Sequence, residues 1–212
     1  WSSSGSVKDA MALANRLGIA HQKIPISELM NSFNNVLASS PWGEPTGITA
    51  ENLQSRIRGT ILMALANQKK HLLLSTGNKS EIAVGYCTLY GDMNGGLSVI
   101  GDLYKTSVFE LCDWIDNESS LAFRNDLFLP EEGEIISNEI RNKPPSAELR
   151  PEQLDSDSLP DYSILDPILK GLIEHHLPTE ALTEKGFNKK TVDKVANLLK
   201  KAEFKRYQAP PL

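Results

Sequence analysis

The sequence predicts a doubly wound α/β domain, in which a parallel sheet lies between helices. Helix-like and strand-like segments alternate at short intervals along the chain. Residues 71–75 form a short, continuously apolar run, which is typical of a strand buried on both faces of a parallel sheet. The polar residues 76–78 that follow would then lie at the carboxyl end of the sheet, where open α/β folds bind their ligands.

Composition excludes several classes of protein. The chain has 212 residues, of which 40% are hydrophobic and 23% charged, as in an ordinary globular protein. A net charge of −5 argues against a protein that coats nucleic acid. The apolar run 61–66 is too short to cross a bilayer, and Cys87 and Cys112 lie too far apart for a CxxC metal site. We therefore expect a cytoplasmic protein that binds neither nucleic acid nor membrane.

Local signals place the individual elements. Ser6 is a candidate N-cap for the first helix, and Gly18 is a candidate stop. Pro25 is expected to end a short strand over 21–26. An apolar stripe marks a long helix over 49–68. Further helices are expected over 27–38, from 102 to about 115, over 163–175 and over 189–204, with a strand over 97–100.

Two other regions have distinctive compositions. Residues 131–166 are acidic and proline-rich, so we expect mostly loop, and we hypothesise an active-site flap over 131–160 that is weakly ordered without ligand. Near the C-terminus, lysines alternate with apolar residues such as Val192 and Val195. This pattern indicates the solvated face of an amphipathic helix rather than a nucleic-acid site.

The densest polar cluster is residues 75–81. A strand end, the hydroxyl of Thr76 and a helix start could together bind a phosphate, and Glu81 could offer an oxygen to Mg²⁺. A plain capped helix is an equally concrete interpretation, with Asn78 as the N-cap and Glu81 completing a capping box.

Three weaker signals also have two interpretations each. The glycine-rich residues 88–96 could let backbone approach a ligand closely, or could form plain turns. Lys105 lies at a helix start, where the dipole disfavours a cation, so it is either an anion ligand or a solvated side chain. Arg56 and Arg58 could bind phosphate or carboxylate, or could form surface ion pairs.

Taken in order, these segments resemble the synthetase domain of the glutamine-dependent bacterial NAD⁺ synthetases. The resemblance implies an adenine-nucleotide α-hydrolase-like fold, with a parallel sheet flanked by helices and a helical C-terminal extension. Residues 1–150 would form the C-terminal portion of the nucleotide-binding core and residues 151–212 the extension. The matching segments are residues 52–58, 75–81, 88–96, 101–106, 144–150, 157–162 and 204–206.

The resemblance also implies a reaction. ATP adenylates the nicotinate carboxylate of deamido-NAD⁺ and releases pyrophosphate, and ammonia then displaces AMP to give the amide. The ammonia would come from glutamine through an upstream amidase domain, Mg²⁺ would accompany ATP, and the protein would be a homo-oligomer. This chemistry consists mostly of positioning and of neutralising phosphate charge.

Matching positions carry the family's binding residues. ATP-binding residues would be Thr76, Lys105 and Ser146, and Glu81 would also be a metal ligand. Deamido-NAD⁺ would contact Asn52, Arg56, Glu81 and Lys205, the last either in its own subunit or from a neighbouring one. Asp102 and Asp157 are weaker candidates, and no residue is assigned to the chemical step itself.

One family motif is missing from these residues: the SGGxDS loop that binds pyrophosphate. We expect this loop and the amidase domain to precede Trp1, so that these residues alone do not turn over. Two alternatives stay open, a related ATP pyrophosphatase such as a GMP-synthetase-like amidotransferase and a non-catalytic nucleotide-binding or oligomerisation module. Protection against thermal unfolding by deamido-NAD⁺, with none by xanthosine monophosphate, would exclude the GMP-synthetase-like enzyme. An SGGxDS motif in the upstream sequence would exclude the non-catalytic module.

Overall fold

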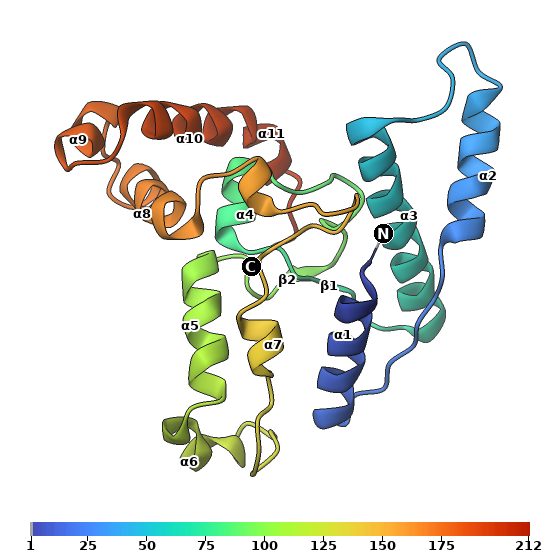
Figure 1. The fold of residues 1–212 in the computed structure, drawn as a ribbon, viewed down its shortest axis with the longest axis horizontal. Helices are drawn as coiled ribbons and strands as arrows, with labels where there is room; N and C mark the ends of the chain where they lie inside the picture. Colours follow the sequence, from blue (N-terminus) through green and yellow to red (C-terminus); the bar gives the residue numbers. More distant parts are fainter. Residues whose placement is uncertain (1) are drawn as a thin grey trace. The chain divides into compact units, whose positions relative to one another are not determined.

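A computed structural model describes residues 2–212 of the chain (Figure 1). The chain forms two compact units. One comprises the residues up to Ile24 together with Thr106–Ser158, and the other comprises Pro25–Lys105 together with Leu159–Leu212. Each unit is therefore built from two separate stretches of sequence.

A parallel pair of strands lies in the second unit. Strand β1 (Leu74–Ser75) pairs with β2 (Leu97–Ser98) in parallel, with Ser75 opposite Ser98. On its other side, the Ser98 N–H donates to the Pro211 carbonyl at 2.8 Å, so the C-terminal tail covers that edge of β2. Helices α2 (Ser27–Ala38) and α3 (Gly47–Lys69) pack on each other in the same unit.

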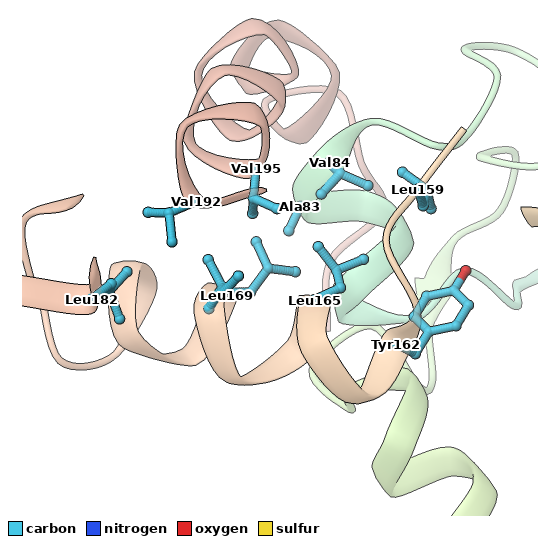
Figure 2. Close-up of a cluster of buried hydrophobic side chains, with 10 residues drawn as sticks. Ala83, Val84, Leu159, Tyr162, Leu165, Leu169, Leu182, Val192 and Val195 are labelled. Atoms are coloured by element: carbon cyan, nitrogen blue, oxygen red, sulfur yellow. The ribbon is translucent and has the colours of Figure 1, made fainter. Parts of the chain in front are cut away.

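The apolar core of this unit joins α4 to the C-terminal helices. Leu165, Ile168 and Leu169 are completely buried against Val192 and Val195. Figure 2 shows Leu165 and Leu169 facing Val192 and Val195, with Ala83 and Val84 of α4 beside them. Burying each large apolar side chain contributes about 1.5–3 kcal/mol, so the core fixes α4 firmly. The helices of this core are α4 (Lys79–Val84), α8 (Tyr162–Ile173), α9 (Thr179–Glu184) and α10 (Lys189–Lys201). Helix α11 (Glu203–Arg206) packs on α4.

The first unit is organised around a buried arginine. Arg124 is 2% exposed, and its guanidinium donates to the carbonyls of Ile115, Pro130 and Gly133 at 2.8–3.2 Å. Asp116 accepts a hydrogen bond from Arg141 at 2.8 Å, which joins the start of the segment 116–141 to its end. The elements of this unit are α1 (Ser4–Arg16), most of α5 (Lys105–Ile115), η1 (Glu118–Ser120), α6 (Leu121–Arg124), α7 (Asn138–Arg141) and η2 (Asp155–Asp157).

Most predicted helices are confirmed, with ends shifted by a few residues. The predicted cap at Ser6 is wrong: Ser3 caps α1, because its hydroxyl accepts from the Ser6 N–H. Residues 131–161 are mostly irregular as expected, with α7 and η2 as short helical turns. None of the helices described here is both long and apolar enough to span a membrane.

Two strand predictions are wrong. Residues 21–26 form no strand, because local sequence alone cannot supply the partner that a strand needs. The predicted strand over 71–75 shortens to Leu74–Ser75 and is not buried on both faces, since Leu72 is 64% and Leu74 46% exposed. The apolar sequence of residues 71–75 therefore does not correspond to burial of these residues in the described part of the chain.

Candidate functional site

Glu81 and Lys105 form an ion pair close to the strand ends. The Lys105 ammonium lies 2.9 Å from Glu81 Oε1, and each side chain is 19% exposed. The ammonium also lies over the face of the Tyr162 ring, 5.5 Å from its centroid, which adds a cation–π attraction. The pair joins the first turn of α4 to the first residue of α5, although 24 residues separate the two in sequence.

The capped-helix interpretation of residues 78–81 is confirmed. Asn78 accepts from the Glu81 N–H at 3.0 Å, and Glu81 Oε2 accepts from the Asn78 N–H at 3.3 Å. Glu81 therefore uses one oxygen for the cap and the other for Lys105. The two roles do not exclude each other, because the cap holds the carboxylate in place for the ion pair.

Thr76 and Ser146 have separate local surroundings. Thr76 is exposed and directly follows β1, so its hydroxyl lies at the carboxyl end of that strand. Ser146 belongs to the other unit, where its hydroxyl accepts from the Glu148 N–H at 3.1 Å. Glu148 itself is bound by Ser3, Ser6 and Lys143.

Asn52 and Arg56 of α3 both hold the glycine-rich loop, residues 88–96. The Thr88 hydroxyl donates to Asn52 Oδ1 at 3.0 Å, and Arg56 Nε donates to the Leu89 carbonyl at 3.2 Å. A side chain at Gly91 would lie 2.2 Å from the Ser55 hydroxyl, so the loop packs directly on α3.

The same loop also packs on the sheet. Gly95 has a φ of +156°, and a Cβ there would lie 2.7 Å from the backbone nitrogen of Ser75 in β1. At both positions the glycine is required by contact with the protein itself. The turn interpretation is confirmed by hydrogen bonds within the loop, from the Gly91 N–H to the Thr88 carbonyl at 3.0 Å and from the Asn94 N–H to the Gly91 carbonyl at 3.1 Å.

Lys205 is bound within its own unit. Its ammonium donates to the carbonyls of Gly85 and Cys87 at 2.7 and 2.5 Å, just past the C-terminus of α4. Burial raises the pKa of the Cys87 thiol to about 12, with the Lys205 charge opposing and the Asp92 and Glu81 charges adding to the shift. The Cys87 thiol is therefore affected by three charges, those of Lys205, Asp92 and Glu81.

Sequence reasoning did not single out Lys79, the first residue of α4. Lys79 lies 2.9 Å from Asp102 and 3.1 Å from Glu174, and its ammonium stacks on the Tyr104 ring. Burial would lower the pKa of Lys79, but the hydrogen bonds to Asp102 and Glu174 more than offset this and raise it. Asp102, a weaker candidate, is thus part of this network, whereas Asp157 pairs with Arg150 at 2.6 Å.

Two more residues that the sequence did not single out are buried beneath the ion pair. Ser80 and Asp166 are 0% and 4% exposed, and they are hydrogen-bonded to each other. No local pattern marks Asp166, because it sits in an apolar helix 86 residues from Ser80. Only the tertiary fold brings the two together.

Residues 2–212 contain no group of three or more His, Cys, Asp or Glu side chains that could hold a metal ion. Magnesium prefers six oxygen ligands in octahedral geometry, commonly one or two carboxylates with water and substrate phosphates. Glu81 could supply one such oxygen, but its carboxylate already binds Lys105 and the Asn78 N–H. The described residues therefore do not make a resident magnesium site by themselves.

Comparison with known protein families matches almost the whole chain. The family model described as NAD synthase matches residues 1–209. The chain belongs to the NAD synthase family. Members of this family among the solved structures share its fold, which confirms the predicted α/β class with a parallel sheet and flanking helices.

Individual relatives agree. A glutamine-dependent NAD⁺ synthetase of Synechocystis sp. is 50% identical over all of this chain, which spans 35% of that protein. The structure of the Acinetobacter baumannii glutamine-dependent NAD⁺ synthetase in complex with ADP is 41% identical, with a TM-score of 0.58 over 99% of this chain and 35% of that one. The corresponding enzyme of Cytophaga hutchinsonii is 25% identical, with a TM-score of 0.75 over 99% of this chain and 33% of that one. The chain thus spans about a third of the length of these relatives.

Proposed function

We propose that this chain carries the ATP-dependent amidation of deamido-NAD⁺ to NAD⁺, within a protein that obtains ammonia from glutamine. The family match over residues 1–209 is the observation that carries this proposal. The ADP complex of the 41%-identical Acinetobacter enzyme supports adenine-nucleotide binding on the same fold. Together they favour NAD⁺ synthesis over a GMP-synthetase-like reaction.

The reaction has two balanced steps. An oxygen of the nicotinate carboxylate attacks the α-phosphorus of ATP, pyrophosphate leaves, and a mixed anhydride with AMP forms. Ammonia then attacks the carbonyl carbon, AMP leaves with the carboxylate oxygen, and the nitrogen loses a proton to give the amide. Both steps need phosphate charge to be neutralised and the reactants to be held in line.

Lys105 is the residue best placed for the first requirement. Its partly buried ammonium is held by Glu81, a carboxylate that a phosphate oxygen can replace with no net loss of charge pairing. Thr76 at the end of β1 and Ser146 would complete the ATP contacts. Asn52, Arg56, Glu81 and Lys205 are proposed to bind deamido-NAD⁺, and Mg²⁺ is proposed to enter with ATP, with Glu81 as a candidate ligand.

Steady-state synthesis of NAD⁺ tests the proposal. In the full-length protein, wild type should convert deamido-NAD⁺, ATP and ammonia to NAD⁺, AMP and pyrophosphate in equal amounts. Lys105→Ala should lower kcat/KM for ATP by about 10²–10³, the usual cost of removing one group that stabilises developing charge. Lys190→Ala, an exposed lysine of α10, is the matched control and should behave as wild type. Wild-type protein that consumes no ATP in the presence of deamido-NAD⁺ and ammonia would favour the non-catalytic module.

The remaining partners are proposals of the same kind. The named relatives are glutamine-dependent, so we infer that an amidase domain supplies the ammonia. We also propose, from the composition, that the protein works in the cytoplasm, and, from the family resemblance, that it is a homo-oligomer. Sedimentation of the full-length protein at micromolar concentration checks the oligomer, and a monomer there would contradict it.

A further inference from the structure

Ser80 lies directly between the backbone of Lys105 and a buried carboxylate. Its hydroxyl donates to Asp166 Oδ1 at 2.6 Å, and its oxygen accepts from the Lys105 N–H at 2.9 Å. Ser80 is completely buried and Asp166 is 4% exposed. The three groups form a continuous chain of hydrogen bonds from α8 through α4 to the start of α5.

The chemistry of the chain fixes its direction. A carboxylate only accepts hydrogen bonds, so Asp166 orients the Ser80 hydroxyl and turns the serine lone pairs toward Lys105. The first N–H groups of a helix have no acceptor within the helix, and Ser80 supplies one to the first residue of α5 from another helix. Because the chain is buried, losing one member leaves the others without water to replace it.

The residues of α4 on either side of Ser80 also bind the segment around Lys105. The Lys79 N–H donates to the Leu103 carbonyl at 2.8 Å, and Glu81 binds the Lys105 ammonium. The Glu81 contact can break when the ammonium binds a phosphate, whereas the Ser80 contact involves the backbone and can persist. Ser80 can therefore hold the base of the side chain while its tip changes partner.

We propose that Ser80 and Asp166 are positioning residues that fix the Lys105 backbone so that its ammonium reaches the ATP phosphates. The inference rests on the proposed function, because it takes Lys105 as an ATP ligand. It assigns to two buried residues an effect on ATP use that they exert without touching ATP.

Kinetics of the full-length protein test this assignment. Ser80→Ala and Asp166→Ala should each raise KM for ATP about tenfold, with a smaller change in KM for deamido-NAD⁺. Asp166→Asn should stay within about twofold of wild type, because its amide oxygen can still accept from Ser80. Equal changes in the two KM values, or an Asp166→Asn variant as impaired as Asp166→Ala, would overturn the proposal.

A double-mutant cycle separates positioning from general damage. In a Lys105→Ala background, adding Ser80→Ala should change KM for ATP less than about twofold, since there is no ammonium left to position. The same tenfold effect in both backgrounds would show that Ser80 acts independently of Lys105. Val195→Ala, which opens a cavity in the core away from Lys105, is the control for lost stability and should leave KM for ATP unchanged.

Hydrogen exchange distinguishes a failure of this proposal from a failure of the proposed function. Absence of NAD⁺ formation by wild type would count against the function alone. The Lys105 amide should exchange at least about tenfold faster in Ser80→Ala than in wild type or Val195→Ala, whatever the activity. Unchanged exchange in Ser80→Ala would contradict the positioning role directly.

Discussion

Single residues at the candidate site combine a structural contact with a proposed role in binding. Glu81 completes a helix cap and pairs with Lys105, while Asn52 and Arg56, which are proposed to bind deamido-NAD⁺, hold the glycine-rich loop. The capping box was predictable, because it depends on residues three apart. The Glu81–Lys105 contact was not, because nothing local in the sequence measures the approach of α4 to α5.

The Glu174 carboxylate gives a prediction on acid stability. The hydrogen bond from Lys79 and the charge of its ammonium hold the pKa of this carboxyl below the ordinary 4.5. A lowered carboxylate pKa adds stability above the ordinary value, and that stability is lost as the pH falls through the lowered one. Glu174→Gln should therefore flatten the fall in unfolding free energy between about pH 5.5 and pH 3, measured by urea denaturation. Parallel curves for wild type and Glu174→Gln would contradict the lowered pKa.

At the scale of elements, periodicity located the helices well. The predicted helix over 27–38 coincides with α2, and the one over 49–68 differs from α3 by two residues at its start. Strands were harder, because pairing depends on distant partners: 21–26 found none, and 71–75 kept only two paired residues. The role of the C-terminal tail in binding α4 and β2 carried no local signal at all.

The contact of Lys205 in α11 with the end of α4 gives a prediction on stability. Lys205 donates to two carbonyls beyond the end of α4, and hydrogen bonds from a charged donor contribute about 1.5–3 kcal/mol. Lys205→Met should therefore lower the unfolding free energy by about 2–3 kcal/mol in urea titrations, whereas Lys201→Met on the exposed end of α10 should change it little.

The same variant separates two roles of Lys205. A rise in KM for deamido-NAD⁺ larger than that for ATP would support the dinucleotide contact proposed for this residue. If Lys205→Met is as stable as wild type, the two carbonyl contacts contribute nothing and the tail is held by other groups.

At the scale of the whole molecule, the chain corresponds to one part of longer relatives. It spans about a third of its named relatives, and its residues provide a lysine, a carboxylate and a glycine-rich loop beside two parallel strands. The family could be inferred from the order of several short motifs, whereas the positions of the functional side chains required the fold. Ser80 and Asp166 illustrate the difference, since their roles follow only from burial and contact.

The most direct test of the account is the fate of the carboxylate oxygen of deamido-NAD⁺. The full-length protein is incubated with ATP, ammonia and deamido-NAD⁺ in which both oxygens of the nicotinate carboxylate are ¹⁸O. The masses of the products are then measured by mass spectrometry. Attack of that oxygen on the α-phosphorus predicts one ¹⁸O in each AMP and none in pyrophosphate. Unlabelled AMP, or label in any other phosphate product, would contradict the adenylation on which the account depends.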